Sequence, residues 1–542
     1  MSGEFTIEEA DVLARCFTNV DQPVFALTNL PEVTKAALFA RYSRSPKSLR
    51  RLFLDEFNDS ANKAALTTSA GVDRAESLFN RVLADYGDDS VAQLAGVHIA
   101  FENVSNLATK IIERPRLMSY LEQSTRYIPF DKKKASGQFR YHVPAELSNA
   151  DQEIFRDAMD RLFLAYQEIT TAIIARLLSD LGPGDIPPIL RATTRAMGLD
   201  ATRGLLPAAT ESNVGVYGSA QAMEQLVLHL YAHPLEEAKV LGETLHKQLK
   251  IMIPSLVIRL DRTERREPWV SYLGATRHLT LDLAELLPNT SVTAPGGQDG
   301  SVLEGELGSR VRLVEFDPHG EDKVSKAIVF ESSNFSSYEI DYIYESMSGE
   351  QLDDLWTNYV GERLNRRHRP GRAFEKTSYK FEIEADYGAF RDLQRHRLLS
   401  CSWQLLGTDL GYFVSPILND NEKKIYLDAI ESVMSLYDIL VERYGKRVAA
   451  YCVPMCFRIR FEIELNAREA MHLIELRSQP QGHPSYREVA QLIYLLIKDQ
   501  AKHNRIAHSM TYVDLSQGVG SRQDSLQREA QKRGDSDNLV TN

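Results

Sequence analysis

The chain has 542 residues, of which 43% are hydrophobic and 25% are charged. This composition is typical of a soluble globular protein, and the length exceeds one ordinary hydrophobic core, so two or more domains are expected. The formal net charge of −12 argues against broad coating of nucleic acid. A local basic site within an acidic protein stays possible.

Residues 1–10 are polar and acidic, without the apolar stretch of a signal peptide. No apolar run reaches the ~18 residues of a membrane helix, so we expect a cytoplasmic protein with no membrane contact. Cys452 and Cys456 have three residues between them, unlike the usual zinc pair, and no second pair exists. Free buried thiols in a reducing cytoplasm are expected, and no metal site is predicted.

The first part of the chain is predicted to be mostly helical. Gln93–Ile112 is a long apolar-rich segment with few breakers, on which His98 and Glu102 would share a helix face. With no third ligand at hand, we expect this pair to be a half-buried polar pair rather than a metal site. Further helices are predicted at 4–57, 73–85, 150–181, 220–230 and 235–253.

Residues 288–310 are rich in Pro, Gly, Ser and Thr and form the clearest linker. We therefore predict one domain at 1–287 and a second at 311–515, followed by a disordered polar tail at 516–542. The second domain is predicted to contain strands at 311–316, 326–331, 380–383 and within 448–464, and helices near 335–366, 423–444 and 466–477.

Residues 113–127 concentrate cationic and hydroxyl side chains. Three arginines, Arg114, Arg116 and Arg126, fall within this run together with two serines. Guanidinium groups match phosphate oxygens bidentately, and serine hydroxyls and backbone N–H groups fill the remaining acceptors, so an anion site is predicted. For the charges alone, a solvated basic helix face is the common alternative.

An internal repeat supports the anion site. Residues 114–119 and 395–400 share the frame R-x-R-L-x-S. Each copy follows a helical segment, and each is followed by a segment that ends in proline, Pro207 or Pro454, and then by a helix. The linker at 288–310 separates the two copies, so the chain is predicted to be a tandem duplication.

These residues resemble the flavin-dependent thymidylate synthases, whose signature is R-H-R-x-x-S-x-N-E-x-S-x-R-Y. The first copy matches this signature over residues 114–127 and departs from it at Pro115 and Leu121. The second copy keeps residues 395–397 and Ser400 and then loses the rest. A later family pattern, N-x-R-x-x-x-[HN]-x-x-x-x-R, is present only in the second copy, at 466–477.

The resemblance implies an α+β fold with two tandem domains, each with helices around a small antiparallel sheet. It also implies that the first copy retains most of the nucleotide elements and the second copy the flavin elements. The residues implied for dUMP are Glu122, Ser124, Arg126, Arg203 and Arg477, those for FAD are His396, Arg397, Asn466, Arg468 and His472, and the implied catalytic residues are Arg395 and Arg477.

The reaction implied is the reductive methylation of dUMP to dTMP, with FAD as cofactor and NADPH and methylenetetrahydrofolate as co-substrates. Composite sites would lie between the repeats, and a homodimer would form a pseudo-tetramer. Asp392 stands where the family has a glutamine, and Leu121 where it has an asparagine. Two alternatives therefore stay open: modification of another pyrimidine nucleotide, and a non-catalytic scaffold that binds nucleotide and flavin.

Overall fold

The computed structural model describes residues 5–43, 45–57, 91–182, 186–285 and 302–516. They fall into two compact units, here called unit 1 (residues 1–102, 111–122 and 213–290) and unit 2 (residues 103–110, 123–212 and 291–542). The helix predicted at 73–85, most of the predicted linker and the tail after residue 516 lie outside the described residues.

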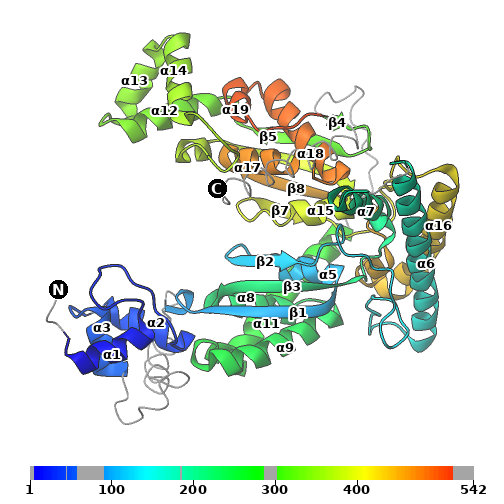
Figure 1. Ribbon diagram of the computed structural model, residues 1–542, viewed down its shortest axis with the longest axis horizontal. Coiled ribbons are helices and arrows are strands. Elements are labelled where there is room, and N and C mark those ends of the chain that lie inside the picture. Colours follow the sequence, from blue (N-terminus) through cyan, green and yellow to red (C-terminus); the bar gives the residue numbers. More distant parts are fainter. Residues whose placement is uncertain (1–4, 44, 58–90, 183–185, 286–301, 517–542) are drawn as a thin grey trace. The chain divides into compact units, whose positions relative to one another are not determined.

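Unit 1 contains most of a three-stranded sheet with the strand order β1-β3-β2 (Figure 1). The strands are β1 (Gly96–Ser105), β2 (Met118–Glu122) and β3 (Glu211–Ser219), and α5 (Asn106–Ile112) follows β1 directly. Helix α8 (Ala220–Tyr231) follows β3 and packs against α9 (Glu236–Met252) and α11 (Thr263–Glu285). The N-terminal helices are α1 (Ile7–Cys16), α2 (Glu32–Tyr42) and α3 (Leu49–Leu52).

The helix expected around His98 and Glu102 is wrong, because residues 96–105 form strand β1. Val97 and Phe101 are buried along it. Pairing with β3, more than one hundred residues later in the chain, supplies the hydrogen bonds that this segment would otherwise make within a helix. His98 and Glu102 therefore do not share a helix face.

Unit 2 contains a five-stranded antiparallel sheet with the order β4-β5-β6-β8-β7. Its central pair, β6 and β8, is in continuous register from Ser378 opposite Asn466 to Asp386 opposite Arg458. The strands are β4 (Val302–Glu304), β5 (Arg310–Phe316), β6 (Ser378–Asp386), β7 (Ser400–Trp403) and β8 (Arg458–Asn466). Helices α15 (Tyr387–Leu393), α17 (Ala467–Arg477), α18 (Pro484–Leu495) and α19 (Asn504–Ser509) accompany the sheet.

Two local predictions in this region are wrong. The strand predicted at 326–331 lies in helix α12 (Gly320–Ser332), which buries Val324 and Ile328, four residues apart, on one face. The end of the predicted linker forms β4, because Val302–Glu304 pairs with the first residues of β5. In both places the tertiary packing outweighs the local composition.

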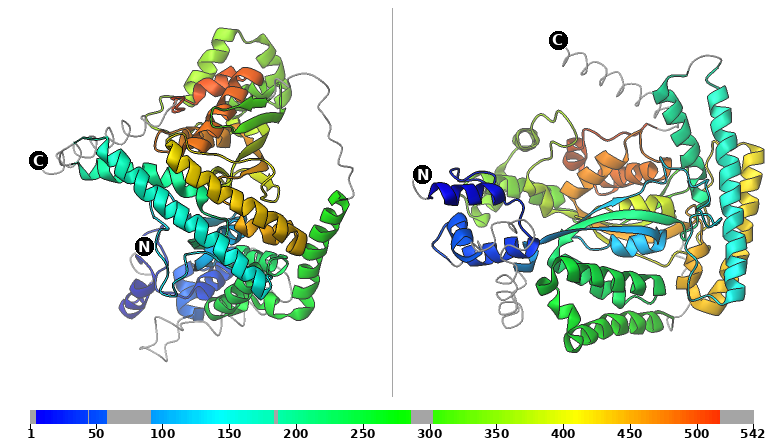
Figure 2. Two further views of the ribbon diagram at one scale, coloured as in Figure 1. Left: turned by 90° about the vertical axis from the view of Figure 1, so that its right-hand side faces the viewer. Right: turned by 60° about the horizontal axis from the view of Figure 1, so that its bottom comes forward.

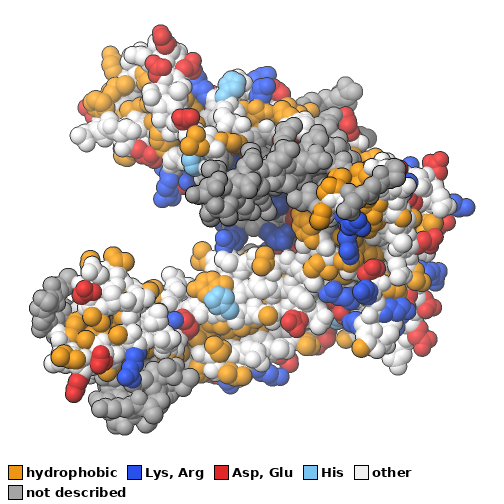
Figure 3. All heavy atoms as spheres, viewed as in Figure 1, with side chains coloured by type: hydrophobic (Ala, Val, Ile, Leu, Met, Phe, Trp, Pro, Cys, Tyr) orange, Lys and Arg blue, Asp and Glu red, His pale blue; other side chains and the backbone are white. Residues whose placement is uncertain are grey.

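The α12 region forms a small helical lobe with α13 (Ser337–Ser346) and α14 (Gly349–Val360). Trp356 of α14 is buried and donates its indole N–H to the Ser325 hydroxyl at 2.8 Å. Exposed aromatic side chains on the lobe include Phe335, Tyr338 and Tyr342. Figure 3 shows hydrophobic side chains over this lobe, at the upper left.

The two sheets confirm the tandem α+β fold. Strands β6, β8 and β7 repeat the order of β1, β3 and β2, and α15 and α17 follow their strands as α5 and α8 do. The helices after β3 and β8 also begin in the same way: Ser219 and Asn466 each accept a hydrogen bond at the N-cap.

Within unit 2 the two copies meet in a short antiparallel pairing at the two prolines that follow the repeated motif. Pro207 lies opposite Pro454. Ala208 N donates to Val453 O at 2.8 Å, and Met455 N donates to Leu206 O at 2.9 Å. The first bond becomes the second when the two copies are exchanged, as expected of a local two-fold axis.

Two long helices, α6 (Asn149–Ser179) and α16 (Asp420–Ala449), run side by side in unit 2 (Figure 2). Helix α6 is long and apolar enough to cross a membrane by length and composition, the one helix in the described part of the chain that is. It packs against α7 (Pro188–Thr202) and α16, and Phe155, Leu162 and Tyr166 are buried. Core helices of soluble proteins pass the same test.

Replacing Gly204 by alanine is expected to destabilise unit 2. A Cβ atom there would overlap the hydroxyl of the buried Tyr426 and lie 3.0 Å from Cys456 Cβ. Overpacking of this kind costs about 1–3 kcal/mol, so the thermal unfolding midpoint of Gly204→Ala should fall. Gly215→Ala is the control, because its Cβ would meet only Leu121 O, at 3.9 Å. Equal midpoints for the two variants would contradict the tight contact at Gly204.

Candidate functional site

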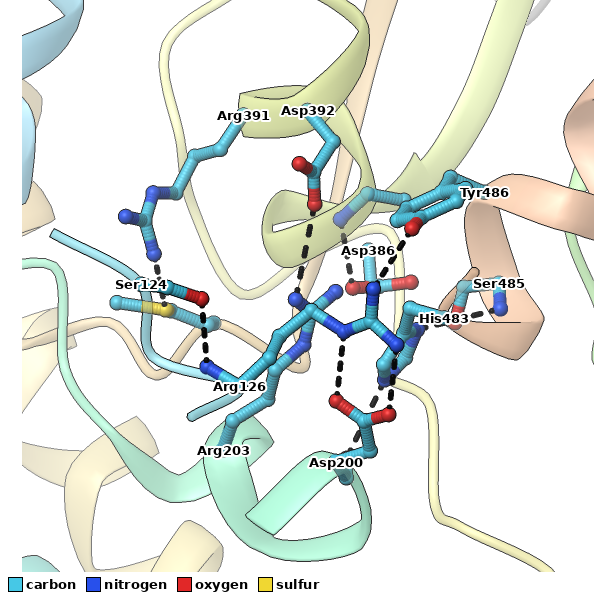
Figure 4. Close-up of polar contacts among 12 residues, drawn as sticks. Ser124, Arg126, Asp200, Arg203, Asp386, Arg391, Asp392, His483, Ser485 and Tyr486 are labelled. Carbon is cyan, nitrogen blue, oxygen red and sulfur yellow. Dashed lines mark hydrogen bonds and ion pairs between the residues drawn. The ribbon is translucent and has the colours of Figure 1, made fainter. Parts of the chain in front are cut away.

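Unit 2 brings four arginines from both copies into one place, here called the arginine cluster (Arg126, Arg203, Arg395 and Arg477). Arg126 lies in the loop after β2, and Arg203 follows the last residue of α7. Arg395 comes just after α15, and Arg477 is the last residue of α17. Figure 4 shows Arg126 and Arg203 close to Asp200 and Asp392.

Arg126 is held by a dense set of hydrogen bonds. Its Nε and Nη2 donate to the two carboxylate oxygens of Asp200, at 2.8 and 2.9 Å. Nη1 donates to the hydroxyl of Tyr486 at 2.8 Å, and Nη2 also donates to Gln481 O at 2.9 Å. Burial alone would lower the pKa of Arg126, but the pair with Asp200 raises it, so the guanidinium stays charged.

Asp392 lies among the arginines of the cluster. Arg395 Nη2 donates to Asp392 Oδ1 at 2.6 Å, whereas Arg477 Nη1 is 3.5 Å from Oδ1 and Arg203 Nη1 is 3.7 Å from Oδ2. Burial alone would raise the pKa of Asp392. The charges of Arg395, Arg477, Arg203 and Arg126 outweigh burial and hold this pKa well below its usual value, so the carboxylate is ionised.

Arg203 is 4% exposed, and its Nη2 atom is buried without a hydrogen-bond partner among the described residues. Gly388 leaves room for this guanidinium, because a Cβ at that position would lie 3.0 Å from Arg203 Nη2. A buried guanidinium with an unused donor is costly unless another acceptor arrives. The cluster therefore has capacity for an additional anion.

Arg477 links the cluster to His396, which follows α15, and through it to Glu469 on α17. Its Nε donates to His396 Nε2 at 3.0 Å, so His396 carries its proton on Nδ1 and donates it to Glu469 Oε1 at 3.0 Å. Burial lowers the pKa of His396 well below its usual value, and the charges of Arg477 and Arg395 add to this effect. His396 is therefore a neutral imidazole in a fixed tautomer.

His472 lies beside His396, with ring centroids 5.3 Å apart, and Arg369 Nη2 bonds to its Nδ1 at 2.9 Å. Burial lowers the pKa of His472 to about 4. Ligand atoms of His396, Glu469 and His472 all lie within 4.8 Å of one another, as in a metal site. Both His396 nitrogens are already bonded, and several guanidinium groups surround the trio. Its electrostatics therefore favour an anion over a divalent cation.

The other residues predicted for FAD lie around the same helix. Asn466 is the N-cap of α17, where its side chain accepts from Glu469 N at 2.9 Å. Arg468 Nε donates to Pro370 O at 3.0 Å, and Arg397 is exposed. Glu469 lies within electrostatic range of Arg468, Arg397, Arg369 and His472. This end of α17 is strongly cationic.

The two remaining residues predicted for dUMP, Glu122 and Ser124, belong to different units. Glu122 is the last residue of β2 in unit 1, opposite Val214, and it is buried. Ser124 belongs to unit 2, where its hydroxyl accepts from Arg126 N at 3.2 Å, in the loop that carries this arginine. Within unit 2, the four arginines, His396 and Ser124 form one connected group.

The sequence reading missed the carboxylates and aromatic groups that hold the arginines. No motif marks Asp200, Glu469 or Tyr486, and no spacing pairs Asp200 with Arg126, 74 positions away. Arg369, which contacts His472, was also missed. Arg369 had one usable signal, because it lies in a run with five arginines between residues 363 and 372. Asp392 was noticed only as a departure from the family pattern.

A cavity of about 260 Å³ adjoins the cluster within unit 2. Asp200, which holds Arg126, lines it together with His483, whose Nε2 is 3.2 Å from Asp200 O. Most of the remaining wall is apolar, including Leu307, Phe413 and Leu492. Polar groups that converge beside an apolar cavity are typical of a small-molecule site.

Cysteine chemistry does not contribute to this site. None of the four cysteines forms a disulfide, and Cys16, Cys452 and Cys456 are buried, as predicted for buried thiols. Burial raises the pKa of Cys456 to about 12, so this thiol is protonated at neutral pH and a poor nucleophile.

The free energy of unfolding is expected to fall as pH drops from 6.5 toward 4. His472 has a pKa of about 4 in the folded protein and an ordinary value of 6.5 when unfolded. Between these values the unfolded chain binds a proton at His472 that the folded chain does not, so the free energy of unfolding rises with pH. The contribution of His472 reaches its full value above pH 6.5. In urea titrations across this range, His472→Asn should show a shallower pH dependence. An unchanged slope would contradict the low pKa.

Comparison with known proteins places the chain in a family. The family model described as thymidylate synthase complementing protein matches residues 29–255 and again 312–501. A UPF0159 protein of Chlamydia pneumoniae is 36% identical over 526 residues, covering 95% of this chain and 97% of that protein. A UPF0159 protein of Thermoplasma acidophilum is 30% identical over 513 residues, covering 89% and 95%.

A flavin-dependent thymidylate synthase of Clostridium tetani is 25% identical over 181 residues, which cover 33% of this chain and 68% of that protein. The double match of the family model agrees with the repeated sheet and with the resemblance read from the motifs. The chain therefore belongs to the family of thymidylate synthase complementing proteins.

Proposed function

We propose that the protein catalyses the flavin-dependent reductive methylation of dUMP to dTMP, with methylenetetrahydrofolate as carbon donor and NADPH as reductant. One observation carries the proposal: Arg126 and Arg203 of the first copy and Arg395 and Arg477 of the second gather around a single buried carboxylate. A composite nucleotide site built from complementary half-sites needs this convergence.

On the nucleotide side, Arg203 and Arg477 are the groups that would bind the 5′-phosphate. Both are largely buried, and Arg203 keeps a donor without a partner among the described residues. Charge-assisted hydrogen bonds from buried guanidinium groups are strong. Arg126 gives most of its donors to Asp200, Tyr486 and Gln481, so its first contribution is positive charge and support of the site. Glu122 and Ser124 are proposed to contact the pyrimidine nucleotide.

On the cofactor side, the cationic end of α17 fits the anionic part of FAD. Arg397 is exposed, Arg468 is partly exposed, and Arg369 contacts His472. Neutral His396 and His472 leave the positive charge on the arginines, and Asn466 fixes the start of the helix. When bound, the flavin would supply the hydride, while these residues hold and orient it.

Arg395 and Arg477 are proposed as the catalytic residues because they connect the two sides. Arg477 contacts His396 through Nε and the backbone oxygen of Asp392 through Nη2, at 3.0 and 2.6 Å. The side chain of Arg395 is 29% exposed and pairs with Asp392, so it lies at the edge of the cluster where a ligand could reach it. Fixed positive charge beside the reacting ring stabilises negative charge that develops there.

We also propose that two chains pair into a pseudo-tetramer in the cytoplasm. The local two-fold axis at Pro207 and Pro454 supports the pairing of two copies within each chain, and two such chains would supply the four copies of a pseudo-tetramer. Light scattering of the purified protein should give twice the 61.2 kDa mass of the chain. A monomer at micromolar concentration would refute the pairing.

A second candidate is the flavin-dependent modification of another pyrimidine nucleotide. The relatives that span nearly the whole chain are UPF0159 proteins, whereas the flavin-dependent thymidylate synthase of Clostridium tetani matches 33% of it. Asp392 also places a negative charge inside the proposed nucleotide site. Both observations favour an altered substrate within the same chemistry.

The test begins with the absorbance of the purified protein. A flavin band near about 450 nm supports either enzyme, and its absence after reconstitution with FAD would refute both. The second step incubates the holoprotein with dUMP, methylenetetrahydrofolate and NADPH and measures dTMP by mass spectrometry. dTMP formation and rescue of a thymidine auxotroph support the first proposal. Flavin binding without dTMP favours the second.

Arg397→Ala and Arg116→Ala form a matched pair of variants that tests the division of labour between the copies. The two residues hold the same position of the repeated R-x-R-L-x-S frame. If the second copy carries the flavin, Arg397→Ala should lose most of the bound flavin, because a charge-assisted contact is removed. Arg116→Ala should keep it. Equal loss in both variants, measured as the ratio of flavin to protein absorbance, would contradict the division.

A further inference from the structure

Asp392 satisfies the arginine cluster only partly. Its carboxylate makes one short contact, to Arg395 at 2.6 Å, while the distances to Arg477 and Arg203 are 3.5 and 3.7 Å. From its place in α15 the carboxylate reaches only Arg395 at a short hydrogen-bond distance. The unused Nη2 of Arg203 is the consequence.

The charges of the cluster do not balance either. Four guanidinium groups face two carboxylates, Asp200 and Asp392, and Asp200 is taken up by Arg126. Asp386 is a third carboxylate, buried beside Arg203; its burial raises its pKa, and the charge of Arg203 acts in the opposite direction. Even with Asp386 counted as ionised, four guanidinium groups face three carboxylates, so positive charge is in excess around Asp392.

The position of Asp392 in its helix is unfavourable without the arginines. It lies in the last turn of α15, where a negative side chain opposes the helix dipole, and it is 9% exposed. A buried carboxylate at such a place is stable only when nearby cations offset the free energy of its desolvation. Its role is therefore tied to the cluster and not to the helix.

We propose that Asp392 is an internal anion that occupies the arginine cluster and determines which anions the cluster accepts. A phosphate group must take the place of this carboxylate among Arg203, Arg395 and Arg477. Free inorganic phosphate brings no other contact, so it binds weakly. A phosphate monoester attached to a larger ligand gains free energy from the rest of that ligand and displaces the carboxylate.

This arrangement makes Asp392 a specificity-determining residue. Displacing the carboxylate costs every phosphate ligand the same free energy. Inorganic phosphate then binds too weakly to occupy the cluster, whereas a larger ligand is still bound through the contacts of its second part. The ligand class is a phosphate monoester with a substantial second part, which includes nucleoside monophosphates. The inference deepens the proposed function but is testable without flavin, nucleotide or turnover.

The experiment measures inorganic phosphate binding to the full-length protein by calorimetry at fixed ionic strength. The wild type should bind phosphate with a dissociation constant in the millimolar range or weaker. Asp392→Asn, which removes the competing charge but keeps the shape, should bind at least about tenfold more tightly. Equal or weaker binding by this variant, or micromolar binding by the wild type, would overturn the proposal.

Two further variants serve as controls. Asp392→Glu keeps the negative charge and should bind phosphate as weakly as the wild type. Asp354→Asn removes an exposed carboxylate on α14 and tests for a general effect of net charge. A gain in Asp354→Asn that equals the gain in Asp392→Asn would also overturn the proposal.

Stability gives an independent readout. Asp392→Asn leaves arginines without their anion, so its melting temperature should be low in phosphate-free buffer and rise with added phosphate more than that of the wild type. A variant that stays unfolded in phosphate would show that phosphate cannot replace the carboxylate, against the proposal. If phosphate binds as expected but no dTMP forms, the anion site stands and the proposed reaction fails.

Discussion

The pairing of residues 204–209 with 451–456 is the constraint on which unit 2 depends. Four backbone hydrogen bonds, related in pairs by the exchange of the two copies, fix the prolines that follow the two motifs opposite each other. The close approach leaves no room for a side chain at Gly204. Arg203, one residue before this glycine, is thereby held in the buried interior.

From this junction the chain can place residues of both copies around one point. Arg203 leaves the end of α7, and Asp392 lies in α15, which starts directly after β6. At the start of α15, Gly388 N donates to Met455 O in the paired segment, and Tyr387 N donates to Phe457 O, one residue after that segment. The junction and the site are therefore joined by backbone hydrogen bonds. These bonds fix the start of α15, which carries Asp392, relative to the segment that follows Arg203.

Burial then sets the chemistry of the charged groups. The histidines on and beside α17 lose their protons because they are desolvated among arginines, whereas Asp392 stays ionised because those arginines surround it. Desolvation acts against charge in every case, and the neighbouring charges decide which groups keep it. An arginine-rich interior with neutral histidines is suited to anions, and this is the physical basis of the proposed nucleotide and flavin sites.

Much of this protein could be read from its residues alone. The R-x-R-L-x-S repeat, the prolines at 207 and 454 and the helix at 466–477 are local patterns, and the fold and the family follow from them. Periodicity also located α6, α8, α9 and α16, because burial on one face imposes a helical repeat. Strand β1 and helix α12 were misread because pairing and packing with distant residues outweighed local preference there.

The partners of the arginines were decided only by the tertiary structure. No spacing connects Arg126 with Asp200 and Tyr486, or Arg477 with His396, since each pair is separated by 74 positions or more. Whether Asp392 is an ordinary surface carboxylate or an anion buried among arginines depends on which charges face it after folding. A sequence pattern specifies which groups a local segment carries, but electrostatic and desolvation energies depend on distances in space, and these distances exist only in the folded chain.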